Sequence, residues 1–410
     1  MSTQQHASFR DIFRQPRSVF AVAFACVIAF MGIGLVDPIL PAIADSLDAT
    51  ATETELLFTS YLLVTGLAML ITSWISSRIG AKRTLLIGLA IIVVFAAAAG
   101  LSQDVEQVIG FRAGWGLGNA LFISTALATI VGSASGGTAS AIMLYEAALG
   151  LGIAVGPLLG GLLGSWSWRG PFFGTATLMA VGFVAILALL GKEDAPRAPM
   201  RLSAPLRALR TPALAVLAAA ALFYNIGVFV LLAYTPFPLG FDAIGLGLTF
   251  FGWGVGLAIT SVLVAPLLTR RMARTSVLRL VLPLLAVDLA AAGLVVRSSI
   301  GLVVCVIVGG LLLGVLNTVL TECVMEATDH PRSVASSAYS SVRFLGGAIA
   351  PPAATELADL FSDATPYYAA AGSVLVALVI VVAGHRWLRR VDADPVDALE
   401  EAQAVTAGDA

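Results

Sequence analysis

Three ionisable side chains lie within long apolar stretches of the sequence. Asp37 precedes Pro38, Arg112 borders a long apolar run, and Glu146 follows Tyr145 in a third stretch. A charge near the middle of a membrane-spanning helix costs about 2.5 to 3.5 kcal/mol on insertion scales, so such residues commonly bind ions, substrates or each other. Asp37 and Glu146 could each carry a proton, and Arg112 could hold Asp37 ionised. We predict that these three residues couple a proton to the protein's activity.

Structural roles for the same kinds of residue stay open at this level. Asp37 could be a solvated acid at a helix end, and Glu146 could form an ion pair or face water. Asp288 lies near the middle of another apolar stretch, and its place in the order of stretches is peripheral. Both a functional and a structural role remain open for Asp288.

A run of glycines gives a sharper signal. Gly152, Gly156 and Gly160 are spaced four apart, Gly161 follows directly, and Pro157 interrupts the run. This spacing lets the backbone of a neighbouring helix approach closely, and the proline bends the helix. We predict that these five residues control closure of the protein without contacting a substrate.

The elements that carry these residues are predicted to be membrane-spanning helices. Of 410 residues, 59% are hydrophobic and 12% are charged, whereas a soluble domain carries roughly 25% charge. A helix needs about 20 apolar residues to cross the hydrocarbon core. Stretches with no charge, or with one or two, predict twelve spans within 18–36, 56–77, 84–103, 113–145, 147–168, 170–191, 211–241, 243–269, 277–297, 298–321, 334–359 and 364–385. The turn formers Gly132–Thr138 end the fourth span and begin the fifth. The predicted fold class is therefore an all-α polytopic membrane protein.

The longest polar connection divides the twelve spans six and six. We expect a cytoplasmic segment at 1–17, a six-helix bundle at 18–191, a cytoplasmic linker at 192–211, a second bundle at 212–390 and an acidic disordered tail at 391–410. Most of the 23 Lys and Arg residues fall in segments on one side of the predicted membrane. The positive-inside rule then predicts a multi-pass protein of the cell membrane with both termini in the cytoplasm.

The two halves also form a weak sequence repeat. Gly116 and Asn119 in the fourth span correspond to Gly314 and Asn317 in the tenth, and other matches keep the same order along the chain. Two parallel six-helix repeats joined by a basic loop are the layout of a transporter whose halves rock about a site at the membrane midplane.

On these motifs the sequence resembles the major facilitator superfamily, specifically its twelve-span drug:proton antiporters. The glycine run matches their fifth-span motif G-x-x-x-G-P-x-x-G-G. The segment Arg112–Ala120 is similar to their R-x-x-q-G-x-g-a-a, whose arginine the family implicates in proton coupling, although Trp115 replaces the usual polar residue. Gly34–Pro41 resembles G-x-x-x-P-x-x-P, and Trp168–Phe172 resembles W-R-x-x-F. The resemblance covers about residues 15–390 and implies the two-repeat major facilitator fold.

A further motif lies between the second and third spans. Arg78, Gly80 and Lys82 match the family pattern G-x-L-a-D-r-x-G-r-k, which implies a part in gating. Ser77 replaces the aspartate that helps to lock the outward-facing state in the family. That departure weakens the case for gating at this loop.

Other site residues are expected from their place in the spans. Arg343 is predicted to pair with Glu322 or Glu326 and so hold a closed state. The substrate pocket is predicted from side chains of both halves, although its aromatic members are explained equally well by helix packing. Its predicted residues are Met31, Tyr61, Asn119, Tyr145, Tyr224, Asn225 and Phe229.

The leading functional hypothesis is secondary active export, in which a proton moves inward as a small lipophilic or cationic compound moves outward by alternating access. The alternative is a facilitator or symporter for a metabolite or lipid. A membrane enzyme or sensor is disfavoured, because the sequence shows neither a His/Asp cluster nor a long soluble appendage. The ATP-binding pattern G-x-x-x-x-G-K-[ST] is absent, and the three cysteines lack metal-site spacing. We expect no cofactor, metal or nucleic acid, and a monomer that binds substrate, protons and the lipid bilayer.

Overall fold

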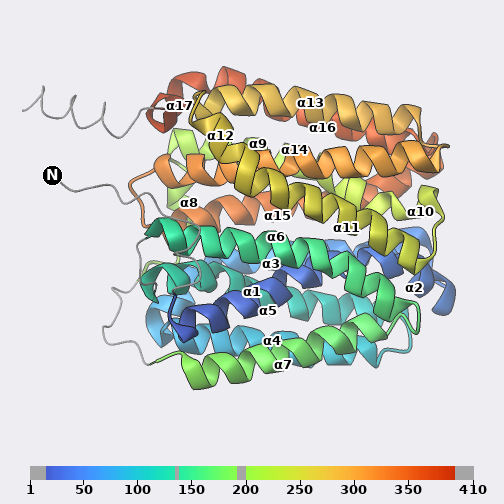
Figure 1. Cartoon of the computed structure of the whole chain (residues 1–410), viewed down its shortest axis with the longest axis horizontal. Coiled ribbons are helices and arrows are strands. Elements are labelled where there is room, and N and C mark those ends of the chain that lie inside the picture. The colour runs from blue at the N-terminus through green and yellow to red at the C-terminus, as the bar shows by residue number, and fades with distance from the viewer. Residues whose placement is uncertain (1–14, 134–137, 192–199, 393–410) are drawn as a thin grey trace, which may run out of the picture.

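The computed structural model describes residues 15–133, 138–191 and 200–392, and in these residues the chain forms helices and no strands. The long helices lie side by side along one direction (Figure 1). They are α1 (Arg17–Gly34), α3 (Ala51–Ile79), α4 (Ala81–Gly100), α5 (Val105–Ser133), α6 (Thr138–Gly164), α7 (Gly170–Leu189), α9 (Pro212–Phe229), α11 (Ala243–Ile259), α13 (Arg274–Leu294), α14 (Ser299–Glu326), α15 (Arg332–Leu360) and α16 (Thr365–Ala383).

Shorter helices continue or connect these. They are the 3-10 turn η2 (Asp37–Ile39), α2 (Leu40–Ser46), α8 (Ala204–Ala208), the π-helical turns η3 (Val230–Tyr234) and η4 (Thr260–Val264), α10 (Pro236–Leu239), α12 (Ala265–Thr269) and α17 (His385–Asp392). Among the described residues, ten helices are long and apolar enough to cross a membrane. The shorter apolar helix α1 and the more polar α15 complete the predicted twelve.

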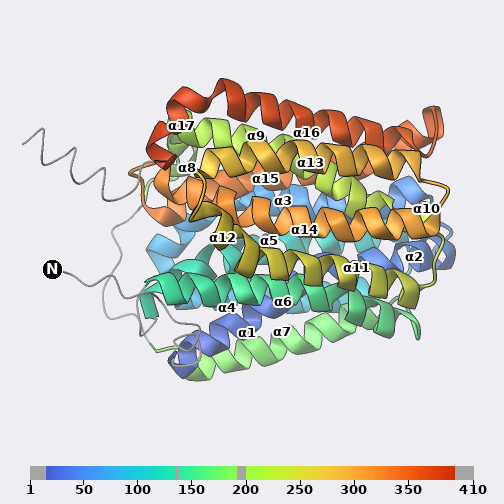
Figure 2. The same ribbon diagram turned by 45° about the horizontal axis from the view of Figure 1, so that its top comes forward.

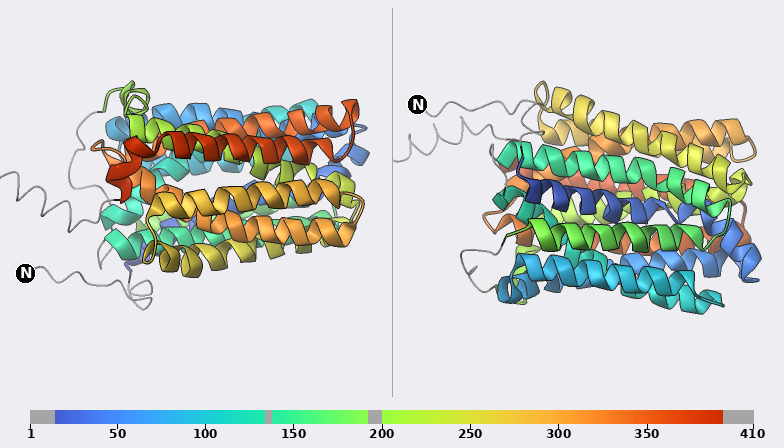
Figure 3. Two further views of the ribbon diagram at one scale, coloured as in Figure 1. Left: turned by 90° about the horizontal axis from the view of Figure 1, so that it is seen from above. Right: turned by 60° about the horizontal axis from the view of Figure 1, so that its bottom comes forward.

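The two halves repeat one packing pattern. In the N-terminal half α1 packs on α6, α3 on α5, and α4 on α7; in the C-terminal half α9 packs on α15, α11 on α14, and α13 on α16. Figure 3 (right) shows α6, α1, α7 and α4 in succession along one side of the molecule. The predicted repeat is confirmed in detail. The Thr65 hydroxyl donates to the Gly116 carbonyl, and the Ser261 hydroxyl donates to the corresponding Gly314 carbonyl.

The halves meet along two pairs of helices, α6 against α11 and α3 against α15 (Figures 1 and 2). Successive long helices run in opposite directions between the two ends of the bundle, and the charged residues named next differ in sign between these ends. The end that carries Arg17, Arg78, Lys82 and Arg274 is called the basic end, and the end that carries Asp45, Asp104, Asp242 and Asp359 is called the acidic end.

Local sequence explains where two helices begin and end. Pro38 and Pro41 follow the last turn of α1, which stops at Gly34, so the first span breaks where the sequence predicts. The second span begins earlier than predicted, at Ala51. Thr50 and Glu53 form a capping box that starts α3 ahead of the apolar run. As a result Glu55, which lies outside the predicted span 56–77, is inside the helix.

The glycines of α6 allow two neighbouring helices, α1 and α11, to pack closely against it. A Cβ atom added to Gly156 would lie 2.6 Å from the Met31 carbonyl oxygen of α1, and Gly152 and Gly160 face the same helix. Gly161 instead faces α11 of the other half, where an added Cβ would lie 3.1 Å from the Cα of Gly247. Helix α6 therefore contacts its own half and the opposite half through backbone-to-backbone packing.

We predict that Gly156→Leu lowers the stability of the protein by about 1 to 3 kcal/mol, because the new side chain overlaps the α1 backbone. Gly372→Leu is the matched control, since Gly372 is a helical glycine with no neighbouring atom within 4 Å of an added Cβ. Thermal unfolding of the purified protein followed by tryptophan fluorescence measures the difference. An equal unfolding midpoint for the two variants would contradict this packing.

Candidate functional site

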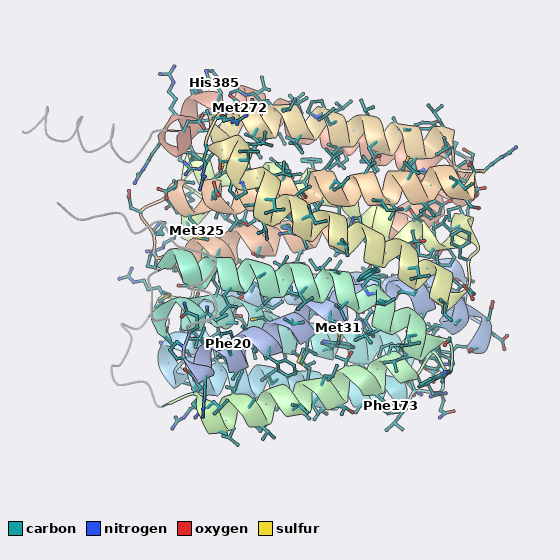
Figure 4. The ribbon with its side chains drawn as sticks, in the orientation of Figure 1. Phe20, Met31, Phe173, Met272, Met325 and His385 are labelled. Carbon is teal, nitrogen blue, oxygen red and sulfur yellow. The ribbon has the colours of Figure 1, made fainter. Side chains whose placement is uncertain are left out.

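A cavity of about 620 Å³ lies between the two halves and extends to the basic end. Its walls come from α3, α5 and α6 on one side and from α13, α14 and α15 on the other. The apolar part of the wall is formed by Met69, Ile123, Leu127, Ala128, Tyr145, Met200 and Met325. Figure 4 labels Met325 at the basic end of the bundle. This volume is within the usual range for sites that bind small organic molecules.

Polar side chains gather where the cavity meets the basic end. Glu322 and Glu326 line it from α14, and Ser333, Ser336 and Ser340 line it from α15. These serines repeat at i, i+3 and i+7, which places them on one helix face. That spacing is readable in the sequence and would have found this wall, whereas no sequence signal marks the methionines.

Glu322 at the mouth of the cavity forms an ion pair with Arg274. The Nε of Arg274 lies 3.1 Å from the Oε2 of Glu322, and both side chains are about one third exposed, at 28% and 35%. Arg274 starts α13 at the same end of the bundle as the last turns of α14, which brings it to Glu322. The pairing of Arg343 with Glu322 or Glu326 stays a prediction. The Arg343 carbonyl accepts a hydrogen bond from the Asn225 amide at 2.8 Å.

The acidic end is closed by contacts between the halves. The Thr59 hydroxyl of α3 donates to the Ala348 carbonyl of α15 at 2.8 Å. The rings of Phe58 and Phe229 pack edge to face with centroids 6.3 Å apart. In the other pair of helices, Gly161 of α6 packs on α11. In this conformation the cavity opens at the basic end and these contacts close the acidic end.

Arg112 lies in α5 with its side chain fully buried. Its guanidinium carbon is 4.2 Å from the centroid of the Tyr61 ring and 4.6 Å from that of Trp115. Its Nε donates to the Leu57 carbonyl and its Nη1 donates to the Gly32 carbonyl of α1, each at 3.5 Å. Trp115, which departs from the family motif, thus supplies an aromatic face to the buried cation.

The remaining predicted coupling residues are only partly visible. Asp37 begins η2, five residues after the Gly32 of α1 whose carbonyl Arg112 contacts. The side chains of Asp37 and Glu146 lie outside the described part of the structure. Asp288 is buried in α13 beside Cys305 of α14, inside the C-terminal half and away from the residues that line the cavity.

The predicted pocket residues divide into two groups. Tyr145 lines the cavity. The others are buried and do not line it in this conformation: Met31, Tyr61, Asn119, Tyr224, Asn225 and Phe229. Tyr224 donates to the Asn317 side chain at 3.1 Å, and Figure 4 labels Met31 within the N-terminal half. These six lie in the packed interior of the bundle.

The loop between α3 and α4 is held by backbone geometry and by Lys82. Gly80 has φ +87°, a conformation that glycine adopts without strain, and it ends α3 and begins α4. The Lys82 ammonium donates to the carbonyls of Leu187 and Leu190. Ser77 accepts a hydrogen bond from the Met200 amide at 3.1 Å. The residue that replaces the family aspartate therefore ties the linker to α3.

Comparison with known proteins decides the family. The family model described as Major Facilitator Superfamily matches residues 22–351. The chain belongs to the major facilitator superfamily. It is a multi-pass membrane transporter and not an enzyme, as predicted. The human organic anion transporter MFSD10 (TETRAN) has the same fold as this major facilitator, with a TM-score of 0.71 and 18% identity, over 89% of this chain and 99% of that one.

Two bacterial proteins are similar in sequence to this major facilitator. The multidrug efflux protein YfmO of Bacillus subtilis (strain 168) is 51% identical over 379 residues, which cover 92% of this chain and 96% of YfmO. The tetracenomycin C resistance and export protein of Streptomyces glaucescens is 30% identical over 210 residues, which cover 48% of this chain and 39% of that protein.

We predict that Arg112→Ala abolishes transport and that Arg112→Lys keeps part of it. A lysine retains the charge, but an ammonium cannot both stack on two rings and reach two carbonyls as the planar guanidinium does. Initial transport rates at equal amounts of inserted protein measure the effect. Normal transport by Arg112→Ala would remove Arg112 from the mechanism.

Proposed function

We propose that this transporter exports small lipophilic or cationic compounds in exchange for protons, by alternating access. The observation that carries the proposal is the cavity between the halves, which has a largely apolar wall and opens at one end. A small lipophilic molecule can bury most of its surface in such a site. The 51% identity to a multidrug efflux protein over nearly the whole chain supports the same substrate class.

The charges at the mouth of the cavity support a preference for cations. Glu326 lines the mouth and is exposed, and Glu322 is only partly neutralised by a solvent-accessible ion pair with Arg274. Such exposed ion pairs are weak, so both acids still contribute negative potential. A lipophilic cation gains from this field before it enters the apolar part of the site.

Sidedness follows from the same charge distribution. We place the basic end in the cytoplasm, because Lys and Arg flank the cytoplasmic ends of spans. The chain then lies in the cell membrane with both termini in the cytoplasm, and the cavity opens inward. Both walls of the cavity come from one chain, which supports a monomer as the working unit.

Proton coupling is assigned to Asp37 and Arg112, with Glu146 as a further candidate. Arg112 is anchored to the carbonyl of Gly32 on α1, and Asp37 starts the segment that follows this helix. A proton on Asp37 would weaken its attraction to Arg112 and so change how α1 packs on α5. Gating is assigned to the contacts of α6, to the Gly80 loop with Arg78 and Lys82, and to Arg343.

Purified protein in proteoliposomes tests the function. A panel of fluorescent cationic dyes and neutral lipophilic drugs is offered under an imposed pH gradient, and substrate and proton fluxes are recorded together. We expect uphill substrate movement coupled to opposite proton flux. Substrate movement without proton flux would overturn antiport and favour a facilitator, and proton flux in the same direction would favour a symporter.

We predict that Asp37→Asn abolishes pH-driven export while the protein remains inserted, because the amide keeps the size of the side chain and cannot release a proton. Asp45→Asn is the control, since Asp45 is an exposed acid of α2 at the same end. The measurement is dye export in proteoliposomes with and without the gradient. Uphill export by Asp37→Asn at the parent rate would remove Asp37 from the coupling role.

A further inference from the structure

Glu55 is a carboxyl group enclosed between the two halves. It lies in the second turn of α3 near the acidic end, and its side chain has no exposed surface. Its Oε2 lies 3.2 Å from the hydroxyl of Thr355 on α15, and its Oε1 is buried with no hydrogen-bond partner. Since α3 and α15 belong to opposite halves, this contact must break whenever the acidic end opens.

The hydrogen bonds around Thr355 favour an uncharged Glu55. The Thr355 hydroxyl lies 3.2 Å from Glu55 Oε2, 3.2 Å from the Pro352 carbonyl oxygen and 3.3 Å from the Thr52 hydroxyl. A hydroxyl has one proton to donate and can accept two hydrogen bonds. If Glu55 is protonated, it and Thr52 donate to Thr355, and Thr355 donates to Pro352. All three contacts are then satisfied.

An ionised Glu55 breaks this arrangement. Glu55 and the Pro352 carbonyl would then compete for the single proton of Thr355. The second carboxylate oxygen would carry charge with no donor in a site that excludes water. Burying a charge without a partner is far more costly than burying a neutral polar group.

Acidic and basic groups both lie on the elements around Glu55. Asp359 lies one turn beyond Thr355 on α15. The buried cation Arg112 lies farther along α3, where its Nε donates to the Leu57 carbonyl and its guanidinium lies over the Tyr61 ring. Several titratable or charged groups lie on the elements packed against α3. They are Arg332, Tyr339, Arg343, Glu356 and Asp359 of α15, Tyr234 of η3, Asp45 of α2, Glu106 and Arg112 of α5, and, at the basic end, Lys82 and Arg83 of α4.

We propose that Glu55 is a second proton-binding site, separate from Asp37, and that it acts as a latch: with a proton bound it ties α3 to α15 and keeps the acidic end closed, and without the proton it lets that end open. The direction of its use rests on the proposed function. If the acidic end faces outward, a proton taken up from outside favours closure there and returns the transporter to the inward-open form.

Spin labels across the acidic end test the latch. Gln103→Cys in the α4–α5 loop and Ser362→Cys in the α15–α16 loop place labels on opposite halves at exposed positions, and the three native cysteines are buried. Distances are measured in full-length protein in nanodiscs between about pH 5 and pH 9, with no substrate and no gradient. We expect the long-distance population to increase as the pH rises, by up to about tenfold per pH unit for one proton.

Three variants separate the latch from general effects of mutation. Glu55→Gln should stay at the short distance over the whole range, with less than about a twofold change in the open population. Thr355→Val removes the acceptor of the latch and should open at lower pH than the parent. Glu53→Gln is the matched control, because Glu53 is a partly exposed acid two residues away and glutamine can keep its place in the capping box, so the pH response should remain.

A parent protein whose distances do not respond to pH would overturn the proposal, and so would a Glu55→Gln variant with the parent's pH response. Equal opening in Thr355→Val and the parent would overturn the role of Thr355 as the partner. These outcomes are independent of the transport assay. A pH-dependent latch in a protein without coupled proton flux would refute antiport alone, and normal antiport with pH-independent distances would refute the latch alone.

Discussion

Close backbone contact along α6 is the constraint on which the rest of the architecture depends. Within lipid there is no hydrophobic driving force between helices, so they associate by close packing and by polar contacts. Helix α6 has glycines toward α1 and toward α11, and it is therefore part of one half and of the interface with the other. Any movement that opens the acidic end has to separate α6 from α11 while α6 stays packed on α1.

Polar contacts on the second interface are arranged differently. Helices α3 and α15 meet through hydroxyl groups, as in the hydrogen bond from Thr59 to Ala348, in addition to the aromatic contact of Phe58 with Phe229. Hydrogen bonds of this kind break and form at little net cost when water can enter. One interface is thus closed by shape and the other by polar groups that respond to solvent and to protonation.

Much of this fold could be predicted from the sequence, because lipid imposes a length and a composition on each span. The break at Pro38, the six-plus-six division and the correspondence of Gly116 with Gly314 all follow from local patterns. Glu55 was missed because the length of a charge-free run does not register a capping box ahead of it. The cavity wall was largely missed because it is built from six helices, and which faces meet is decided by tertiary packing.

The methionines of the cavity wall affect how the binding site fits molecules of different shapes. Met69, Met200 and Met325 reach it from α3, from the segment before α8, and from α14. Each has an unbranched side chain with three rotatable bonds and a polarisable sulfur. Rotation about these bonds can therefore change the shape of the cavity wall without displacing a helix. Affinity in such a site should follow the volume and lipophilicity of a molecule more closely than its outline, and an inhibitor made rigid to fit one shape would gain little from that rigidity.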